Sequence, residues 1–304
     1  MCRRARVSRR SVVITIAWLV LALVGGADVV AADGGLRDMA GREVAVTAPV
    51  RRIVSLVPSV TEIVYALGGE ERLVGVTDFC DYPAAARQKR SVGGMVAPSL
   101  EVMVALRPDL VVATTGGNSD ETFRHLARLG IPTYAIEVNH FTEMMDLIGR
   151  VGDLTGRQQA AGPLVATLEA RIAFIRRAVA PFAAPRVLYV LWPEPLIVPG
   201  RDSLITELID AAGGRSVTAD EPQGYPRFSL EAAVARAPEV IVLAQHGPGT
   251  KALPMDPWQR LASLPAIKSG RVHAVDGALM HRYGPRVVEG LEVLARLFHP
   301  EAFR

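Results

Sequence analysis

Short apolar runs alternate with amphipathic segments along the chain from Arg52 onward. The runs are rich in Val, Ile and Leu, which is typical of strands buried on both faces of a parallel sheet. Between them, apolar residues recur at helical spacing, and Gly-Gly pairs end two of the segments. This alternation predicts βαβ units. In the first part of the chain, strands are expected at 52–57, 73–78, 109–114 and 132–137, and helices at 61–67, 99–106 and 121–129.

The pattern changes at Phe141, where a long helical stretch with few breaks begins. From Thr155 to Ala180 the apolar positions keep the spacing of one helix face over about 25 residues, or ~37 Å. Pro163 indicates that this helix starts or bends there. The apolar positions are Leu164, Val165, Leu168, Ile172, Phe174 and Ile175.

The strand and helix alternation then restarts. Strands are expected at 186–192, 240–244 and 271–276, and helices at 203–212, 257–264 and 285–298. The sequence therefore predicts an α/β protein of two parallel-sheet lobes joined by a single long rigid helix. The expected boundaries are 33–154 for the N-terminal lobe, 155–182 for the interdomain helix and 183–304 for the C-terminal lobe. One long helix between lobes would limit their hinge motion.

One sequence phrase occurs twice. Ser99–Thr114 and Ser229–Ala244 share seven of sixteen aligned positions and fall at equivalent places in the two predicted lobes, which indicates a duplicated fold. Each copy has a glutamate at its third position, Glu101 and Glu231. The serines are expected to cap the helices, which places both carboxylates in the first turn, where the helix dipole favours them. Capping alone does not require a glutamate at the matching position of each lobe.

Residues 1–32 have the three parts of an export signal. Arg3–Arg10 is basic, Val12–Val24 is apolar, and Val30–Ala32 is a small-residue cleavage site. The alternative is an uncleaved anchor, but the apolar run is shorter than the ~20 residues of a membrane span. Ser8–Val13 also resembles a twin-arginine signal. No cysteine follows the apolar run, so a lipid anchor is not expected.

The net charge of +3 comes from the N-terminus. The first 32 residues contain five Arg and one Asp, and the rest of the chain has 29 basic and 30 acidic residues. A nearly neutral body gives no electrostatic reason to expect a nucleic-acid partner. The 304 residues, half of them hydrophobic and few aromatic, suit two domains of ordinary size.

Catalytic and metal-binding motifs are absent from the sequence. We find no dinucleotide-binding glycine motif, Walker loop, nucleophile elbow or zinc-protease helix. The six His show no metal-ligand spacing, so no metal site is expected. Cys80, the one cysteine left after cleavage, is expected to be a small buried residue rather than a reactive or ligating thiol. An exported two-lobed protein without catalytic groups suggests a binding protein with a ligand cleft between its lobes.

Four segments together resemble a known family. They are "RRIVSLVPSVTEIVYALG", "LVGVTDFCDYP", "SLEVMVALRPDLVVAT" and "LEAAVARAPEVIV". The resemblance is to the periplasmic substrate-binding proteins of ABC importers for iron-siderophores, haem and cobalamin, and it extends from Arg51 to Phe298. The "DYP" turn and the "PSxTE" opening are most similar to the cobalamin-binding members. The resemblance implies two α/β lobes bridged by a long helix, and a protein that binds a ligand in the cleft and catalyses nothing.

The resemblance also implies a set of ligand-binding residues. Met95 stands where the cobalamin-binding relatives have a tryptophan, and the spacing around Asp276 and Arg282 is about two residues longer here, so the match of Asp276 is looser. Trp192 also ends a predicted strand, where open α/β sheets place ligands. For each residue the alternative is ordinary packing or a surface role. The expected ligand-binding residues are Tyr82, Met95, Trp192, Tyr225, Asp276 and Arg282.

By the same resemblance, Glu101 and Glu231 are expected to meet Arg clusters on the two permease subunits of an inner-membrane importer. The expected protein is a periplasmic monomer without a cofactor that binds a corrinoid, namely cobalamin. Haem or a ferric siderophore is the alternative ligand. An exported enzyme of similar two-lobed fold, as in nitrogenase-like proteins, is the alternative from another class. That enzyme would need cluster-binding cysteines, and the lone Cys80 argues against it.

Overall fold

The computed structural model describes residues 36–46, 48–245 and 261–304. The predicted export signal, residues 1–32, lies outside the described residues. So does the first half of the helix expected at 257–264, and its described part, 261–264, is a turn that leads into a later helix. Within the described residues, no helix is long and apolar enough to cross a membrane.

The N-terminal lobe is built on a four-stranded parallel sheet of order β4-β3-β5-β6. β5 is buried along its first four residues, as expected for a central strand covered on both faces. A short antiparallel hairpin of β1 and β2 precedes the sheet. The strands are β1 Leu36–Arg37, β2 Glu43–Val44, β3 Ile53–Ser55, β4 Leu73–Val76, β5 Leu110–Thr114 and β6 Thr133–Ile136.

The helices of this lobe connect its strands. α3 begins after Ser99, whose side chain accepts a hydrogen bond from the Val102 amide (3.3 Å), so the predicted cap is present. The helices are α2 Pro58–Ala66, α3 Leu100–Leu106 and α4 Asp120–Arg128, with short 3₁₀ turns at Glu70–Arg72 (η1) and Ala84–Gln88 (η2).

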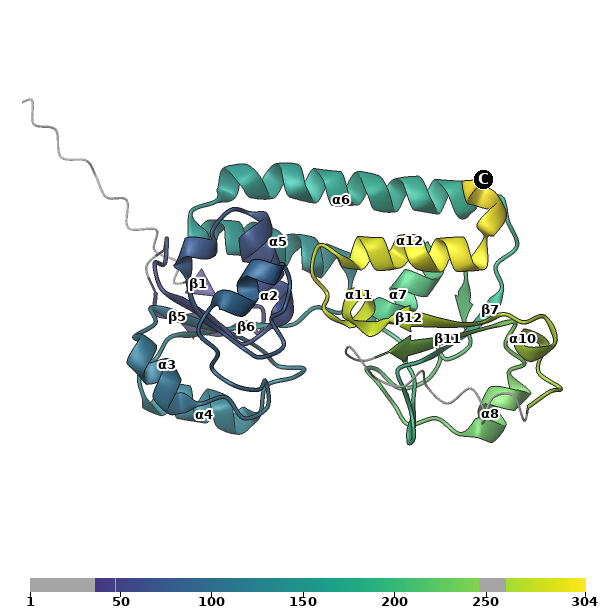
Figure 1. Cartoon of the computed structure of the whole chain (residues 1–304), viewed down its shortest axis with the longest axis horizontal. Helices are drawn as coiled ribbons and strands as arrows, with labels where there is room; N and C mark the ends of the chain where they lie inside the picture. Colours follow the sequence, from purple (N-terminus) through teal and green to yellow (C-terminus); the bar gives the residue numbers. More distant parts are fainter. Residues whose placement is uncertain (1–35, 47, 246–260) are drawn as a thin grey trace, which may run out of the picture. The chain divides into compact units, whose positions relative to one another are not determined.

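Two helices follow the first lobe. α5 (Phe141–Thr155) ends at Gly156, whose left-handed backbone (φ 65°) reverses the chain into α6 (Gln158–Val179). The two helices pack closely, since a Cβ on Gly152 would lie 2.8 Å from the Ala161 Cβ. α6 extends above both lobes (Figure 1) and contacts α5 on one side and α7 and α12 on the other.

The C-terminal lobe repeats the topology of the first. Its parallel sheet has the order β10-β7-β11-β12, and an antiparallel β8–β9 hairpin is inserted after β7. β11 follows α8 just as β5 follows α3, and both strands are third in their sheets. The duplicated phrase therefore marks the same place in each lobe. The strands are β7 Arg186–Val190, β8 Trp192–Pro193, β9 Leu196–Ile197, β10 Arg215–Ser216, β11 Val240–Gln245 and β12 Val272–Asp276.

The helices of this lobe lie on both sides of its sheet (Figure 1). Ser229 caps α8 by accepting a hydrogen bond from the Ala232 amide (3.0 Å), the equivalent of the Ser99 cap. The helices are α7 Leu204–Ala211, α8 Leu230–Ala235, α10 Pro265–Lys268, α11 Gly277–His281 and α12 Val287–Phe298, and a 3₁₀ turn (η3 Pro300–Phe303) follows. The expected fold class of two parallel-sheet α/β lobes is confirmed.

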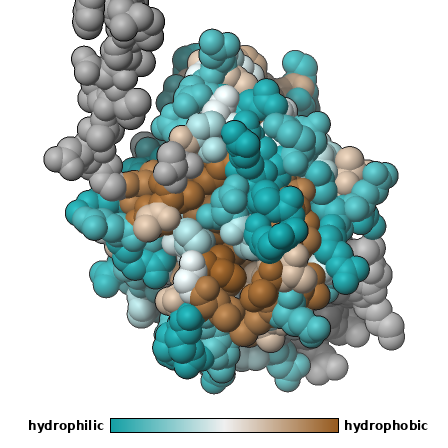
Figure 2. Space-filling model, turned by 90° about the vertical axis from the view of Figure 1, so that its left-hand side faces the viewer, coloured by the Kyte–Doolittle hydropathy of each residue, from teal (hydrophilic) through white to brown (hydrophobic). Residues whose placement is uncertain are grey.

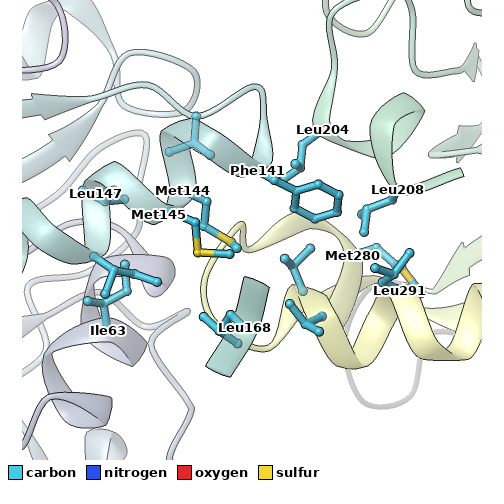
Figure 3. Close-up of a cluster of buried hydrophobic side chains, with 14 of the residues drawn as sticks. Ile63, Phe141, Met144, Met145, Leu147, Leu168, Leu204, Leu208, Met280 and Leu291 are labelled. Carbon is cyan, nitrogen blue, oxygen red and sulfur yellow. The ribbon is translucent and has the colours of Figure 1, made fainter. Parts of the chain in front are cut away.

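The lobes share one hydrophobic core. Besides a separate cluster within each lobe, the largest cluster runs from α2 and α5 of the first lobe through α6 to α7, α11 and α12 of the second. Figure 3 shows its centre, where Phe141 of α5 approaches Leu204 and Leu208 of α7. The buried apolar surface below α6 therefore stabilises the two lobes as a single unit.

Candidate ligand cleft

A cleft of about 1110 Å³ lies between the two lobes. One wall is formed by the residues that follow all four strands of the N-terminal sheet: 57–59 after β3, 78–81 after β4, 114–117 at the end of β5 and 136–139 at the end of β6. The other wall consists of Tyr225 and of residues that follow β12, namely 277, 278 and 281–283. Ligands of open α/β sheets bind at the carboxyl ends of the strands, where these residues lie.

Large apolar side chains stand on both walls. Phe79 on the first lobe has 56% of its surface exposed, and Tyr225 on the second has 39%. Burial raises the pKa of the Tyr225 hydroxyl well above its ordinary value, so the phenol stays protonated at neutral pH. Met95 lies on the first wall with them. An aromatic surface of this kind can cover a large planar ligand at little cost in side-chain entropy.

Asn118 fixes the wall around Met95. Its buried side chain donates a hydrogen bond to the Met95 carbonyl (2.7 Å) and accepts one from the Thr114 amide (2.8 Å). Gly117 allows the approach of the Met95 side chain, since a Cβ there would lie 3.1 Å from the Met95 Cε. The loop after β5 and the segment that carries Met95 are thereby held together.

Neutral polar groups make up much of the remaining lining. Hydroxyl and amide side chains can both donate and accept hydrogen bonds, which suits a ligand rich in amides or hydroxyls. These groups come from both lobes: Ser59, Thr114, Thr115, Asn139, Tyr225 and Tyr283.

Arg282 on the second wall contacts two carboxylates of the first lobe. Its Nη1 lies 2.5 Å from Asp81 Oδ1 and 3.5 Å from Glu62 Oε1. The hydrogen bond from Arg282 lowers the pKa of Asp81, so Asp81 stays ionised at neutral pH. Burial raises the pKa of Glu62 even though Arg286 and Arg282 both favour its charged form. These contacts tie the loop between α11 and α12 to the first lobe.

Arg286 completes this contact between the lobes. Its Nη1 lies 3.5 Å from Glu62 Oε1, and its guanidinium stands 3.9 Å above the ring of Tyr82. A cation over an aromatic face is attracted to the ring. Arg286 of the other lobe therefore covers one face of the Tyr82 ring, and Tyr82 is not among the residues that line the cleft.

His281 also lines the cleft. Its Nε2 is 2.9 Å from the hydroxyl of Tyr189, which is fully buried at the end of a strand. Burial raises the pKa of Tyr189 well above its ordinary value. Across the described residues, no group of three or more His, Cys, Asp or Glu is arranged to hold a metal ion.

The six expected ligand residues divide into two groups. Met95, Tyr225 and Arg282 line the cleft together. Tyr82 stacks with Arg286, and Trp192 lies on β8 with its indole donating a hydrogen bond to the Glu194 carbonyl. Asp276 caps α11 by accepting a hydrogen bond from the Ala278 amide (2.8 Å). Those last three do not border the cleft, and ligand contact by any of the six stays a prediction.

Phe79, Asp81 and Arg87 are among the cleft residues that were not singled out from the sequence. Phe79 lies two residues before Asp81 in the "TDFCDYP" segment, and Arg87 follows it. The motif that identified Tyr82 pointed to this turn, but it did not reveal which side chains face the cleft. Cys80, between Phe79 and Asp81, is buried as expected. Its sulfur lies 3.2 Å from the hydroxyls of Thr61 and Thr77, and burial raises the pKa of its thiol.

Glu101 and Glu231 lie exposed in the first turns of α3 and α8. Both helices are on the side of their lobes away from α6 (Figure 1). An exposed aliphatic side chain accompanies each glutamate: Val104 of α3 (45% exposed) and Leu230 of α8 (39%). Figure 2 shows the end of the N-terminal lobe, where apolar areas interrupt a largely hydrophilic surface.

Comparisons with known proteins agree with this geometry. A family model described as periplasmic binding protein matches residues 53–279. An uncharacterized ABC transporter substrate-binding lipoprotein of Bacillus subtilis is 29% identical over 88% of this chain and 86% of its own length. The crystal structure of the periplasmic vitamin B12 binding protein of Vibrio cholerae is 26% identical, with a TM-score of 0.74 over 84% of this chain and 99% of that one. A periplasmic heme binding protein from Pseudomonas aeruginosa is 28% identical, with a TM-score of 0.75 over 83% and 94%.

Proposed function

The chain belongs to the periplasmic binding protein family, and we propose that it captures a corrinoid, namely cobalamin, in the cleft between its lobes. Like the family and its relatives, it is a substrate-binding protein of the ABC-transporter type and not an enzyme. The identity of the ligand is the proposal.

The observation that carries the proposal is the chemistry of the cleft lining. The cleft, about 1110 Å³, exceeds the ~300–1,000 Å³ of ordinary small-molecule pockets, which favours a ligand of macrocycle size. Aromatic surface from Phe79 and Tyr225 can cover a flat ring from both lobes. The neutral hydroxyl and amide groups on both walls match the many peripheral amides of a corrinoid. The vitamin B12 binding protein among the structural neighbours supports the same ligand.

Haem is the second candidate. Tyr283 and His281 both line the cleft, and either type of side chain can ligate iron. A heme binding protein is also among the similar structures. The charges of the cleft favour the corrinoid. In the described chain, both arginines that line it, Arg87 and Arg282, contact the carboxylate of Asp81, whereas haem carries two propionates that need free cations.

The place of action and the partner are further parts of the proposal. The basic and apolar N-terminal segment directs the chain to the periplasm, where residues 1–32 are removed. The partner is an inner-membrane permease dimer, which receives the loaded protein. Glu101 and Glu231, one on each lobe and each beside an exposed aliphatic side chain, provide the charged and apolar contacts for this docking.

Visible absorption spectroscopy tests the ligand. Purified protein from residue 33 onward is mixed in turn with cobalamin, cobinamide, haemin and a ferric siderophore, and free ligand is removed by gel filtration. We expect the corrinoid spectrum to co-elute with the protein. Retention of haemin or the siderophore, with no corrinoid retained, would replace the proposed ligand and leave the transport role in place.

A further inference from the structure

A single carboxylate, that of Asp81, contacts both arginines in the described part of the cleft wall. Its Oδ1 lies 2.5 Å from Nη1 of Arg282, and its Oδ2 lies 3.6 Å from Nη2 of Arg87. The two arginines come from different lobes and contact different oxygens of Asp81. No lysine is found in the lining formed by the described residues. Asp81 therefore offsets one of the two positive charges that these arginines could present to a ligand.

The other carboxylates near the cleft do not have this role. Glu62 contacts Arg282 at 3.5 Å, but it is 4% exposed, is shared with Arg286 and is not part of the cleft wall. Asp78 and Glu137 do line the cleft, and neither is in an ion pair with a described residue. Of the carboxylates on the wall, Asp81 alone forms ion pairs with the described arginines.

We propose that Asp81 determines the ligand charge that the cleft accepts, by excluding ligands that present carboxylates to this wall. An incoming carboxylate that paired with Arg282 or Arg87 would come close to the ionised Asp81, and the two negative charges would repel each other. Specificity of this kind comes from a cost imposed on the wrong ligand. An amide edge has no net charge and meets no such cost. The inference rests on the proposed function. It assigns to Asp81 the selectivity of the cleft for a corrinoid.

The ionisation of Asp81 supports this role. Its hydrogen bond with Arg282 lowers its pKa below the ordinary value, so the negative charge persists through the neutral range. Without that charge, Arg87 would lose its described carboxylate partner, and Arg282 would keep only its 3.5 Å contact with Glu62. Arginine presents paired N–H donors that match a carboxylate, which gives strong and oriented recognition. Replacing Asp81 should therefore convert a wall that rejects carboxylates into one that binds them.

Asp81→Asn tests the proposal, with three probes and one matched control. The probes are cobalamin, a cobalamin monocarboxylic acid in which one peripheral amide is hydrolysed, and haemin. The control is Glu137→Gln, which removes one negative charge from the same cleft without releasing an arginine. Dissociation constants are measured by absorption titration for wild type and both variants at low and high salt.

We expect wild type to bind cobalamin about tenfold or more tightly than its monocarboxylic acid. Asp81→Asn should remove that preference and strengthen haemin binding by about tenfold or more, which is the scale of a hydrogen bond to a charged group. The gain should shrink at high salt, because it is electrostatic. Glu137→Gln should change the ratio of the affinities for the three probes several-fold less than Asp81→Asn does.

Two results would overturn the role of Asp81. One is an Asp81→Asn protein whose relative affinities for the three probes equal those of wild type. The other is an equal shift in Glu137→Gln, which would mean that only the net charge of the cleft matters. If Asp81→Asn does not fold, the wild-type comparison decides: equal affinity for cobalamin and its acid contradicts the proposal. Failure of cobalamin to bind at all would refute the proposed function, and the haemin titrations would still test Asp81.

Discussion

Phe79 is largely exposed on the cleft wall, although the large apolar ring of a phenylalanine is usually buried. With 56% of its surface open, it contributes little to the core of its lobe, which lies behind it. A ligand that covers the ring would gain the transfer of this apolar surface out of water. The side chain is therefore placed to stabilise the complex rather than the fold.

Phe79→Ala should weaken corrinoid binding by about 1–2 kcal/mol, as expected when an aromatic contact is truncated at a binding site. Calorimetric titration measures the change, and the melting temperature should stay close to that of wild type. Phe174→Ala is the matched control, because Phe174 is 59% exposed on α6 and does not border the cleft. If the Phe79 variant and wild type bound the corrinoid with equal affinity, this ring would not contribute to the ligand site.

The sequence predicted part of the site at the level of single residues. Met95, Tyr225 and Arg282 were expected at the cleft and do line it. The pairing of Arg282 with Asp81 was not predictable, because it joins residues 201 positions apart on different lobes. A motif places a turn in the fold, but the direction of each side chain in that turn depends on its packing. For this reason Phe79 and Asp81 were missed, although their neighbour Tyr82 was named.

The elements followed the sequence pattern closely where the pattern was regular. The two Ser-Leu-Glu phrases start capped helices, and each is followed by a buried strand at the same position in its sheet. The long helical stretch was less readable. Its periodicity continues from Phe141, yet the chain forms two helices because Gly156 adopts a left-handed conformation and turns the chain back. This turn determines which elements each helix face packs against, and periodicity alone could not predict that.

The apolar cluster below α6 should make the two lobes unfold together. Phe141 at the start of α5 is 5% exposed and packs with side chains of α7 (Figure 3). Phe141→Ala should lower the free energy of unfolding by about 3–5 kcal/mol. Denaturant unfolding followed by circular dichroism and by tryptophan fluorescence should show coincident transitions in wild type.

Val293→Ala is the control for this cluster. Val293 is 36% exposed on α12, and its loss should cost less than about 1 kcal/mol. Two separate unfolding transitions in wild type, or an equally small effect of Phe141→Ala, would show that the lobes are stabilised independently.

At the scale of the whole molecule, the duplication gives the two lobes exposed glutamates at matching positions, Glu101 and Glu231, on the face away from α6. Reversing both charges with Glu101→Arg and Glu231→Arg should leave ligand affinity and melting temperature nearly unchanged, because both side chains are exposed and distant from the cleft. Uptake through the cognate importer should be abolished, since charged contacts at an interface set orientation and can each be worth ~2–5 kcal/mol. Uptake of radiolabelled ligand into cells measures the effect.

The matched control reverses two carboxylates elsewhere. Asp153→Arg with Glu169→Arg changes the net charge equally, and these exposed residues lie on α5 and α6, on the other side of the molecule. Uptake by this control should remain at the wild-type rate. If the Glu101 and Glu231 double variant took up ligand at the wild-type rate, both residues would serve only to stabilise their helices.

Calorimetric titration of the protein from residue 33 onward with cobalamin is the most direct test of the central claim, the capture of a corrinoid between two lobes. We predict saturable binding with one cobalamin per chain and a negative heat-capacity change, because the ligand buries the apolar surface of the cleft. The absence of binding with both cobalamin and cobinamide, together with saturable binding of haemin to the same preparation, would contradict it.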